Sequence, residues 1–215
     1  MPRNLYTALF CLLLPVYFAR LCWKGLSNKE YFLRWSERLG YSSELPSKDK
    51  SIIWIHAVSV GEVNASISLL RSLITDYPYS EILVTTTTPT GSKLLIDRLG
   101  NKIKHQYLPV DIPFFINSFL NKWNPKILIL LETEIWPNLI NICKSRGIYS
   151  ALVNARLSEK SKKNYLNYRA LIKPVIEKID LILTQFESDK RRFQEIVERK
   201  DINTCGNLKF DQDVP

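Results

Sequence analysis

The chain has 215 residues, of which 46% are hydrophobic, with a formal net charge of +9 and a sequence pI near 9.4. This length suits one domain with an appendage, and the apolar content can build a core, which excludes a disordered chain or a coiled coil. The surplus of Lys and Arg favours anionic partners, namely phospholipid headgroups, phosphorylated substrates or nucleic acid.

The cysteines and histidines do not form a metal-binding pattern. No two cysteines have the C-x-x-C spacing, and neither histidine lies at ligand spacing from any of Cys11, Cys22, Cys143 and Cys205. We therefore expect no metal site. Single thiols of this kind are typical of a reduced, cytosolic domain.

The N-terminus carries an uncharged apolar segment from Asn4 to Ala19. About 16 helical residues reach about 24 Å, against a hydrocarbon core of about 30 Å, so spanning a membrane requires snorkelling and local thinning. A shallow insertion in the membrane plane is the alternative. A cleaved signal peptide or a core helix competes with both, but no small-x-small cleavage site follows the segment.

Basic residues are more frequent after this segment than before it: Arg20, Lys24, Lys29, Arg34 and Arg38 follow, and Arg3 precedes. By the positive-inside rule, this asymmetry places the main domain on the cytoplasmic face. We expect residues 1–22 to form a retained membrane anchor and residues 23–50 a basic amphipathic connector.

From Ser51 onward, short apolar runs alternate with amphipathic stretches, which predicts a parallel sheet covered by helices on both faces. Strands are expected at Ile52–His56, Glu81–Thr85, His105–Pro109, Lys126–Leu131, Tyr149–Asn154 and Asp180–Thr184. Helices are expected at Glu62–Asp76, Gly91–Leu99, Pro113–Lys122, Pro137–Lys144, Glu159–Glu177 and Ser188–Arg199. Residues 51–215 are thus predicted to form an open, doubly wound α/β domain.

Candidate functional residues follow the first expected strand, because ligands of open α/β sheets bind outside the carboxyl ends of the strands. Ser59 stands three residues before Glu62 at the start of a helix. This spacing is that of a capping box, which is the interpretation favoured by the residues alone. The alternative is a carboxylate in a crevice that accepts a proton from a sugar hydroxyl.

Later strand ends carry further polar residues. Helix capping and turn chemistry explain most of Thr85 to Gly91, although its hydroxyls would also suit a sugar or phosphate. Glu132 and Glu134 follow a buried strand, where carboxylates are costly unless they meet a partner or a cleft, so we favour a site over a solvated loop. Arg156 either grips an anionic group or simply precedes the helix cap Ser158.

Together, these segments resemble the 3-deoxy-D-manno-octulosonic acid (Kdo) transferases of lipopolysaccharide biosynthesis. Six motifs occur in the family's order: RWSERLG at 34–40, WIHAVSVGE at 54–62, TTTTPTG at 85–91, LETEIWPN at 131–138, NARLS at 154–158 and CGNLKFD at 205–211. The resemblance implies the Rossmann-like N-terminal half of a GT-B glycosyltransferase. That half receives the lipid A precursor (lipid IVA), and a second domain binds the donor CMP-Kdo. The implied reaction is an inverting transfer at the inner membrane, with no metal and no cofactor.

The resemblance also implies roles for individual residues. Glu62 corresponds to the base that deprotonates the acceptor, and Glu132 to a second essential carboxylate. Supporting, substrate-binding roles are implied for Ser59, Gly61, Thr87, Glu134, Arg156 and Lys209.

Expected partners are the lipid A precursor and an anionic membrane surface, but not nucleic acid. Basic residues at 160–163 and 190–192 are candidate contacts to phosphates, or else solvated helix surface, which we favour for the second group. The sequence ends at Pro215, where the family's second domain is expected to begin. Activity is therefore expected to need a separate donor-domain chain; the alternative is an inactive remnant that binds the lipid precursor at the membrane.

Overall fold

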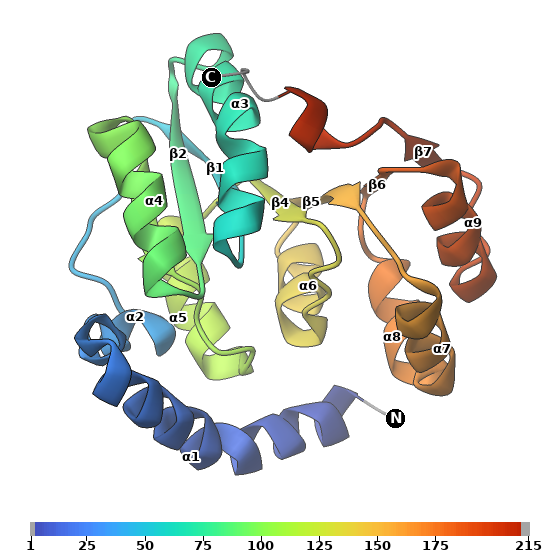
Figure 1. The fold of residues 1–215 in the computed structure, drawn as a ribbon, viewed down its shortest axis with the longest axis horizontal. Coiled ribbons are helices and arrows are strands. Elements are labelled where there is room, and N and C mark those ends of the chain that lie inside the picture. The colour runs from blue at the N-terminus through green and yellow to red at the C-terminus, as the bar shows by residue number, and fades with distance from the viewer. Residues whose placement is uncertain (1–2, 212–215) are drawn as a thin grey trace.

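A computed structural model describes residues 3–211 and shows a twisted parallel sheet flanked by helices (Figure 1). Within this range, seven strands pair in the order β3-β2-β1-β4-β5-β6-β7, all of them parallel. The strands are β1 Ser51–His56, β2 Ser80–Thr86, β3 Lys104–Tyr107, β4 Ile127–Leu131, β5 Tyr149–Ala155, β6 Leu181–Thr184 and β7 Ile202–Thr204. The predicted open α/β sheet is confirmed.

Helices connect successive strands. The α-helices are α1 Arg3–Ser27, α2 Trp35–Arg38, α3 Val60–Asp76, α4 Pro89–Leu99, α5 Pro113–Trp123, α6 Pro137–Ser145, α7 Glu159–Asn167, α8 Arg169–Ile176 and α9 Glu187–Ile196. Short 3₁₀ helices are η1 Lys29–Phe32, η2 Gly100–Lys102 and η3 Leu208–Asp211. α4, α5 and α6 each begin with proline, which suits the first helical turn because that position donates no intrahelical hydrogen bond.

The helices form two layers around the sheet. α5, α6, α8 and α9 pack on one face, where the rings of Trp54 and Phe119 lie 4.6 Å apart in the core. α3 and α4 cover the other face, over β1, β2 and β3. β1, β2 and β3 follow one another toward one edge of the sheet, and the connection through α5 then places β4 on the other side of β1. The order of the strands therefore reverses at the boundary between β1 and β4. Such a switch point opens a crevice at the carboxyl ends of the strands.

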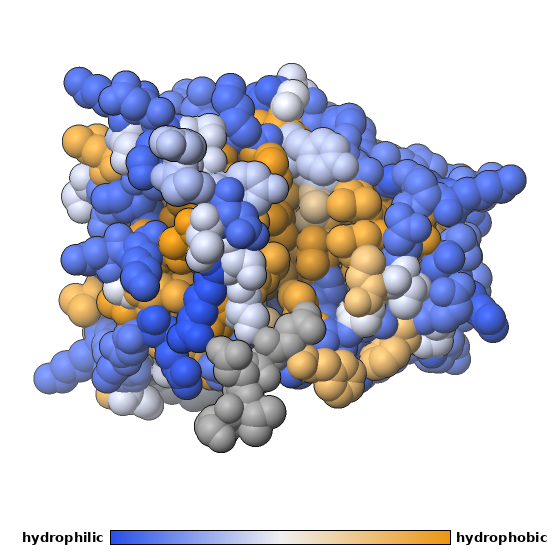
Figure 2. All heavy atoms as spheres, turned by 90° about the horizontal axis from the view of Figure 1, so that it is seen from above, coloured by the Kyte–Doolittle hydropathy of each residue, from blue (hydrophilic) through white to orange (hydrophobic). Residues whose placement is uncertain are grey.

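The α3 side of the sheet is incompletely covered beyond β1. Its outward-facing residues on β4, β5 and β6 are apolar yet only half-buried: Ile127, Ile129, Val153, Leu181 and Leu183. Figure 2, seen from the side of the molecule opposite α1, shows hydrophobic surface between hydrophilic flanks. Leu208 of η3 packs over part of this area, and the residues named above remain half-buried.

Three sequence-based expectations about elements are wrong. The helix expected at Glu159–Glu177 is divided at Tyr168 into α7 and α8. Pro174 lies inside α8, where it removes one backbone hydrogen bond and crowds the preceding turn. Strand β7 was not expected because it has only three residues. β3 ends at Tyr107, two residues earlier than expected, before a proline that cannot donate to a strand ladder.

Helix α1 is longer than the apolar segment suggests. It has 25 residues, or about 37 Å at 1.5 Å per residue, and it passes the expected boundary between residues 1–22 and 23–50. Among residues 3–211, α1 is the one helix long and apolar enough to cross a membrane. In the structure it lies against the domain as a curved helix (Figure 1). Tyr6 and Thr7 hydrogen-bond to Asp111 and Asn138.

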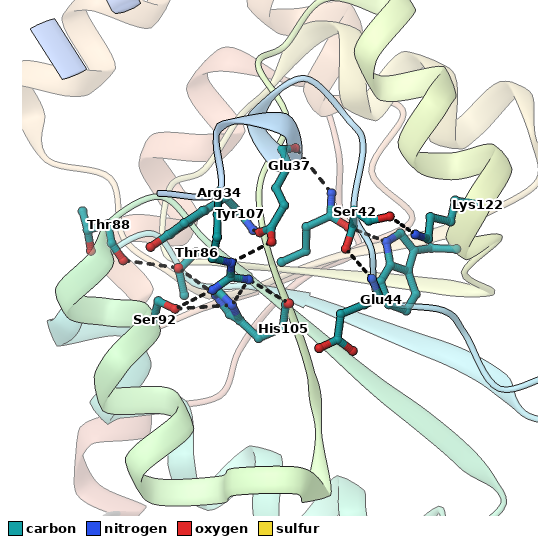
Figure 3. A network of polar contacts seen from close by, with 12 residues as sticks. Arg34, Glu37, Ser42, Glu44, Thr86, Thr88, Ser92, His105, Tyr107 and Lys122 are labelled. Carbon is teal, nitrogen blue, oxygen red and sulfur yellow. Dashed lines mark hydrogen bonds and ion pairs between the residues drawn. The ribbon is translucent and has the colours of Figure 1, made fainter. Parts of the chain in front are cut away.

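Charged side chains of the segment after α1, Arg34 and Glu37, form hydrogen bonds with residues of β3 (Figure 3). The Arg34 guanidinium donates to Glu37 at 2.6 Å and to the His105 ring at 2.9 Å, and the Tyr107 amide donates to Glu37 at 2.8 Å. Burial, with the charges of Arg34 and Arg38, lowers the pKa of His105 to about 3, so this ring is neutral. Arg34 is thus held by contacts to the sheet while it remains partly exposed, and Arg38 is fully buried.

Candidate functional site

Glu62 lies at the start of α3 with its side chain folded back onto the preceding loop. Its carboxylate accepts hydrogen bonds from the Val58 amide at 2.7 Å and from the Ser59 hydroxyl at 3.1 Å. Ser59 is the N-cap of α3, but its side chain makes no capping hydrogen bond to the backbone. The capping box favoured from the sequence is therefore only half formed: the Glu62 carboxylate interacts with the Ser59 backbone amide, but the Ser59 hydroxyl donates to the carboxylate instead of accepting from the helix.

The environment of Glu62 favours its protonated form. The residue is only 8% exposed, and this burial raises the pKa of the carboxyl. The Val58 hydrogen bond opposes the rise, whereas the negative charge of Glu132 adds to it. A carboxylate with a raised pKa is a better proton acceptor near neutral pH than an exposed one. Glu62 and Glu132 therefore lie close enough to interact, on either side of the switch point.

Glu132 follows β4 in a left-handed backbone conformation, with a φ of 56°. Its amide donates to the carbonyl of Val153 on β5 at 3.0 Å, so the strand ladder holds the residue in this conformation. For a residue with a Cβ, left-handed geometry costs about 1–2 kcal/mol. Such strain is found where a structure fixes the direction of a functional side chain.

Glu134 lies two residues further along the same loop, partly buried. Burial, and then the negative charges of Glu62 and Glu132, raise the pKa of Glu134 to about 7. The structure therefore brings together Glu62, Glu132 and Glu134, which the sequence placed on separate segments. Among residues 3–211, no group of three or more His, Cys, Asp or Glu has a metal-binding arrangement.

Two aromatic rings beside the carboxylates were not anticipated as site residues. The rings of His56, at the end of β1, and Trp136, before α6, lie 6.3 Å apart edge to face. Burial lowers the pKa of His56 to about 4, so the ring is neutral. The His56 Nε2 atom is buried and has no hydrogen-bond partner within residues 3–211. The Trp136 side chain interacts with the Glu134 carboxyl and opposes the rise in its pKa. Both residues lie in motifs noted above, 54–62 and 131–138. Membership of these motifs is the feature of the sequence that could have marked them as site residues.

The threonines after β2 fulfil local structural roles. Thr88 caps α4 by accepting a hydrogen bond from the Gly91 amide at 3.2 Å, which confirms the capping interpretation. The Thr87 hydroxyl donates to the Val58 carbonyl at 3.1 Å and ties the loop after β2 to the loop after β1. Thr87 thereby supports the backbone that holds Glu62.

Three further candidates, Gly61, Arg156 and Lys209, make no side-chain contact with the carboxylates that the structure describes. A Cβ added to Gly61 would meet only the Ser59 hydroxyl, at 3.8 Å, so packing does not require glycine there. Arg156 is exposed, and its backbone carbonyl accepts a hydrogen bond from Thr133. Lys209 is exposed on η3. No contact described for residues 3–211 joins the Arg156 or Lys209 side chain to the three carboxylates.

The basic residues of α7 and α9 are partly engaged with acids of the same region. Lys162 forms ion pairs with Glu159 and Glu195, at 3.0 and 2.8 Å. Arg192 pairs with Glu159 at 2.7 Å and with Asp189 at 3.3 Å. These contacts favour the interpretation of both groups as helix surface over a free phosphate site.

A cavity of about 600 Å³ opens beside the carboxylates, between α1 and the carboxyl ends of the sheet. Residues after β1, β2, β3 and β4 form one wall, and α1 forms the other. Glu134 and Trp136 belong to its lining. The carboxylate cluster therefore adjoins a space large enough for a small-molecule ligand.

Sequence comparison assigns the family. The family profile described as 3-deoxy-D-manno-octulosonic-acid transferase (kdotransferase) matches residues 33–212. The chain belongs to this family. The resemblance inferred from the motifs is thus confirmed over most of the sequence.

Related Kdo transferases match almost the whole chain. The 3-deoxy-D-manno-octulosonic acid transferase of Haemophilus influenzae is 38% identical over 213 residues, which cover 97% of this chain and 49% of that protein. The Rickettsia bellii enzyme of the same name is 34% identical over 96% of this chain and 49% of that protein. A probable mitochondrial 3-deoxy-D-manno-octulosonic acid transferase of Arabidopsis thaliana is 35% identical, with coverages of 96% and 47%. The chain spans about half the length of these curated relatives.

Solved structures share the fold at low sequence identity. A UDP-GlcNAc 2-epimerase from Neisseria meningitidis, crystallised with UDP-GlcNAc, superposes with a TM-score of 0.54 and 14% identity, over 75% of this chain and 48% of that one. Another UDP-N-acetylglucosamine 2-epimerase gives 0.53 and 15%, over 75% and 47%. These similarities confirm the Rossmann-like fold expected for the N-terminal half of a GT-B protein.

Proposed function

We propose that this Kdo transferase family chain is the acceptor-binding half of an enzyme that transfers Kdo from CMP-Kdo to the lipid A precursor in lipopolysaccharide biosynthesis. The observation that carries the proposal is the convergence of Glu62, Glu132 and Glu134 at the switch point of the sheet. Family membership supports the reaction class, and the geometry supports the roles of the residues.

In the proposed step, Glu62 is the base. Its carboxylate takes the proton of an acceptor hydroxyl while that oxygen attacks the anomeric carbon of Kdo. A carbon–oxygen bond forms to the acceptor, the bond from Kdo to the phosphate breaks, and CMP leaves with the bonding electrons. Attack from the face opposite the leaving group inverts the anomeric centre. The Val58 amide and the Ser59 hydroxyl hold the carboxylate in place for this transfer.

We propose that Glu132 and Glu134 bind the hydroxyls of the acceptor sugar. The left-handed backbone at Glu132 and its amide hydrogen bond to Val153 fix the position of the Cα–Cβ bond, from which the carboxylate extends. Glu134, with a pKa raised to about 7, exists in both protonation states near neutral pH and can donate or accept a hydrogen bond. Thr87, Gly61, Arg156 and Lys209 are assigned supporting roles around this centre.

The outward face of α1 supports a membrane location. Its exposed apolar side chains recur at helical spacing and form one stripe away from the domain: Leu5, Leu9, Leu12, Trp23 and Leu26. The opposite face carries Tyr6, Thr7 and Tyr17, which hydrogen-bond to the domain. We propose that α1 lies in the plane of the inner membrane, with the domain on the cytoplasmic face, because a spanning helix would forfeit these hydrogen bonds.

The partly exposed apolar residues of β4, β5 and β6 support the proposal that a second domain packs against this chain. Half-buried Ile129, Val153 and Leu183 lie on the α3 side of the sheet, which α3 and η3 cover only in part. Relatives of about twice this length supply additional chain. We propose that a donor-binding domain, in a separate chain or a continuation of this one, completes the enzyme.

A reconstitution experiment tests this function. The purified chain in lipid nanodiscs is offered labelled CMP-Kdo and lipid A precursor, with and without a candidate donor-domain protein. We expect transfer only in the combined sample, and we expect Glu62→Gln to reduce it by at least about 100-fold, the usual contribution of a general base. Glu198→Gln, at an 81% exposed side chain, is the matched control and retains activity.

Three outcomes contradict the proposal. Transfer by Glu62→Gln at the wild-type rate excludes Glu62 as the base. Binding of the lipid precursor without transfer under either condition identifies a binding remnant instead of an enzyme half. Salt-sensitive binding to nucleic acid, without binding to the lipid, excludes both.

A further inference from the structure

Helix α1 is attached to the domain near its two ends and arches over a cavity between them. At its N-terminal end, the Tyr6 hydroxyl donates to Asp111 at 2.9 Å. Toward its C-terminal end, the Tyr17 hydroxyl accepts from Arg38 at 3.2 Å, and Gly25 packs closely against the ring of Phe32. Between these attachments the helix spans the cavity of about 600 Å³.

The side chains of α1 that face this cavity are apolar and incompletely packed. Phe10, Leu14 and Tyr17 recur at helical spacing and are each half-buried, and Leu21 continues the row as a buried residue. The opposite wall includes Val58, Leu108, Pro109 and Val110. From Phe10 to Lys24 the cavity follows α1 for about 20 Å. An elongated apolar space of this size suits a hydrocarbon chain.

Polar groups in the lining indicate that the occupant also carries a charged headgroup. Arg20 and Lys24 border the cavity from α1, and neither forms an ion pair with any residue in the described range 3–211. Trp136, also in the lining, interacts with the neighbouring Glu134 carboxyl, so these two side chains form one polar spot in the cavity wall. The cations attract an anion such as phosphate, and the Glu134 carboxyl can accept a hydrogen bond from a sugar hydroxyl.

We propose that this cavity binds one acyl chain of the phosphorylated glycolipid acceptor, with a phosphate at Arg20 and Lys24 and the sugar directed to Glu134 and Trp136. The identity of the lipid rests on the proposed function. A glycolipid is favoured over a bilayer phospholipid because Glu134 belongs both to the cavity and to the carboxylate cluster. A chain held under α1 thus brings the reacting hydroxyl to Glu62.

Photochemical labelling tests the acyl-chain site. The full chain, in nanodiscs of phosphatidylcholine, is exposed to a lipid A precursor that carries a diazirine at one acyl end. We expect crosslinks to residues 10–21 and 108–110. Leu14→Trp fills the cavity and reduces this labelling at least about tenfold. Leu12→Trp, at an outward side chain with 74% exposure, is the matched control and leaves the labelling unchanged.

Charge substitutions test the headgroup site. The double variant Arg20→Gln with Lys24→Gln is expected to weaken binding of the precursor by roughly tenfold or more, and to leave binding of the dephosphorylated lipid unchanged. Arg3→Gln with Lys29→Gln removes the same charge from other positions and preserves binding. Competition by phosphatidic acid as effective as that by the precursor would show a general phospholipid site and overturn the glycolipid assignment.

Three results overturn the cavity itself. These are labelling confined to the outward stripe of α1, equal effects of Leu14→Trp and Leu12→Trp, and full labelling of Leu14→Trp. Leu14→Ala, which enlarges the cavity, separates filling from misfolding, because it preserves labelling where a misfolded variant does not. Labelling requires no donor, so failure of transfer with labelling retained rejects the proposed enzyme but not this site.

Discussion

The hydroxyl of Tyr6 donates a 2.9 Å hydrogen bond to the carboxylate of Asp111, although 105 residues separate the two along the chain. Asp111 is 1% exposed and also accepts from the amides of Asn138 and Leu139 at the start of α6. One buried carboxylate therefore joins the apolar helix α1 to the first turn of α6, beside the strand ends that carry the candidate site.

Tyr6→Phe is expected to loosen α1 without unfolding the domain. The variant removes a donor from a buried charged group, a loss of about 1.5–3 kcal/mol when the group has no replacement. Amide exchange in the first turns of α1 should accelerate accordingly, which hydrogen–deuterium exchange measures. Tyr79→Phe, at a side chain with 87% exposure, is the control and should leave exchange unchanged. Unchanged α1 exchange in Tyr6→Phe would contradict a role in docking.

Asp111 should make stability depend on pH below neutrality. Burial raises the pKa of Asp111 from 3.8 to about 6, against the opposing hydrogen bonds from Asn138 and Tyr6. The folded state then holds the proton more tightly than the unfolded state. As the pH rises from about 4 to about 6, the free energy of unfolding should fall by about 3 kcal/mol through this group.

Chemical denaturation of the wild type and Asp111→Asn across pH 4 to 7 isolates this contribution, because other titrating groups are common to both proteins. The difference between their unfolding free energies should change through the stated window and be constant above it. A difference independent of pH would show that Asp111 titrates alike in the folded and unfolded states.

Glu132 should be replaceable by glycine with a gain in stability. Its φ of 56° costs a residue with a Cβ about 1 kcal/mol, and glycine avoids that cost. Glu132→Gly should therefore be more stable to denaturant than Glu132→Ala by about 1 kcal/mol. Both variants remove the carboxylate equally, and both should bind the lipid acceptor more weakly than the wild type. Equal stabilities would show that no strain is stored at this position.

Gly61→Ala separates stability from binding at the start of α3. The added Cβ finds open space and glycine is unfavourable in a helix, so the unfolding free energy should rise by roughly 0.5 kcal/mol. If Gly61 borders the acceptor, as proposed, affinity for the lipid should fall at the same time. Calorimetry and lipid binding measured on one preparation check both. Unchanged affinity would remove Gly61 from the binding surface.

Gly40 should be far less replaceable than Gly147. Both have positive φ, 84° and 70°, but a Cβ at Gly40 would lie 2.3 Å from the backbone oxygen of Phe115, whereas one at Gly147 meets nothing within 4 Å. Gly147→Ala should cost about 1 kcal/mol from the backbone alone. Gly40→Ala should cost about 3 kcal/mol or more, because the backbone of the turn after α2 and that of α5 must also move apart. Equal losses by denaturation would contradict the close packing.

Local patterns were sufficient for the order of β1 to β6 and for the helices between them. The run Lys126–Leu131 is apolar on both faces, and such a run is stable only as a central parallel strand, which β4 is. The positions of Glu62 and Glu132 after β1 and β4 then followed from the general rule that open sheets bind ligands at strand ends. Helix periodicity did not reveal the break at Tyr168, because α7 and α8 meet without a local stop signal.

Contacts between distant residues decided the rest. The spacing of Ser59 and Glu62 is compatible with a capping box, and only the tertiary structure places the Val58 amide and Glu132 beside the carboxylate. Composition likewise identified α1 as apolar, but it did not predict which face of the helix contacts the domain. The hydrogen bond from Tyr6 to Asp111 determines that face, because a buried carboxylate is stable only when donors satisfy it. No short-range sequence pattern predicts a hydrogen-bond partner 105 residues away.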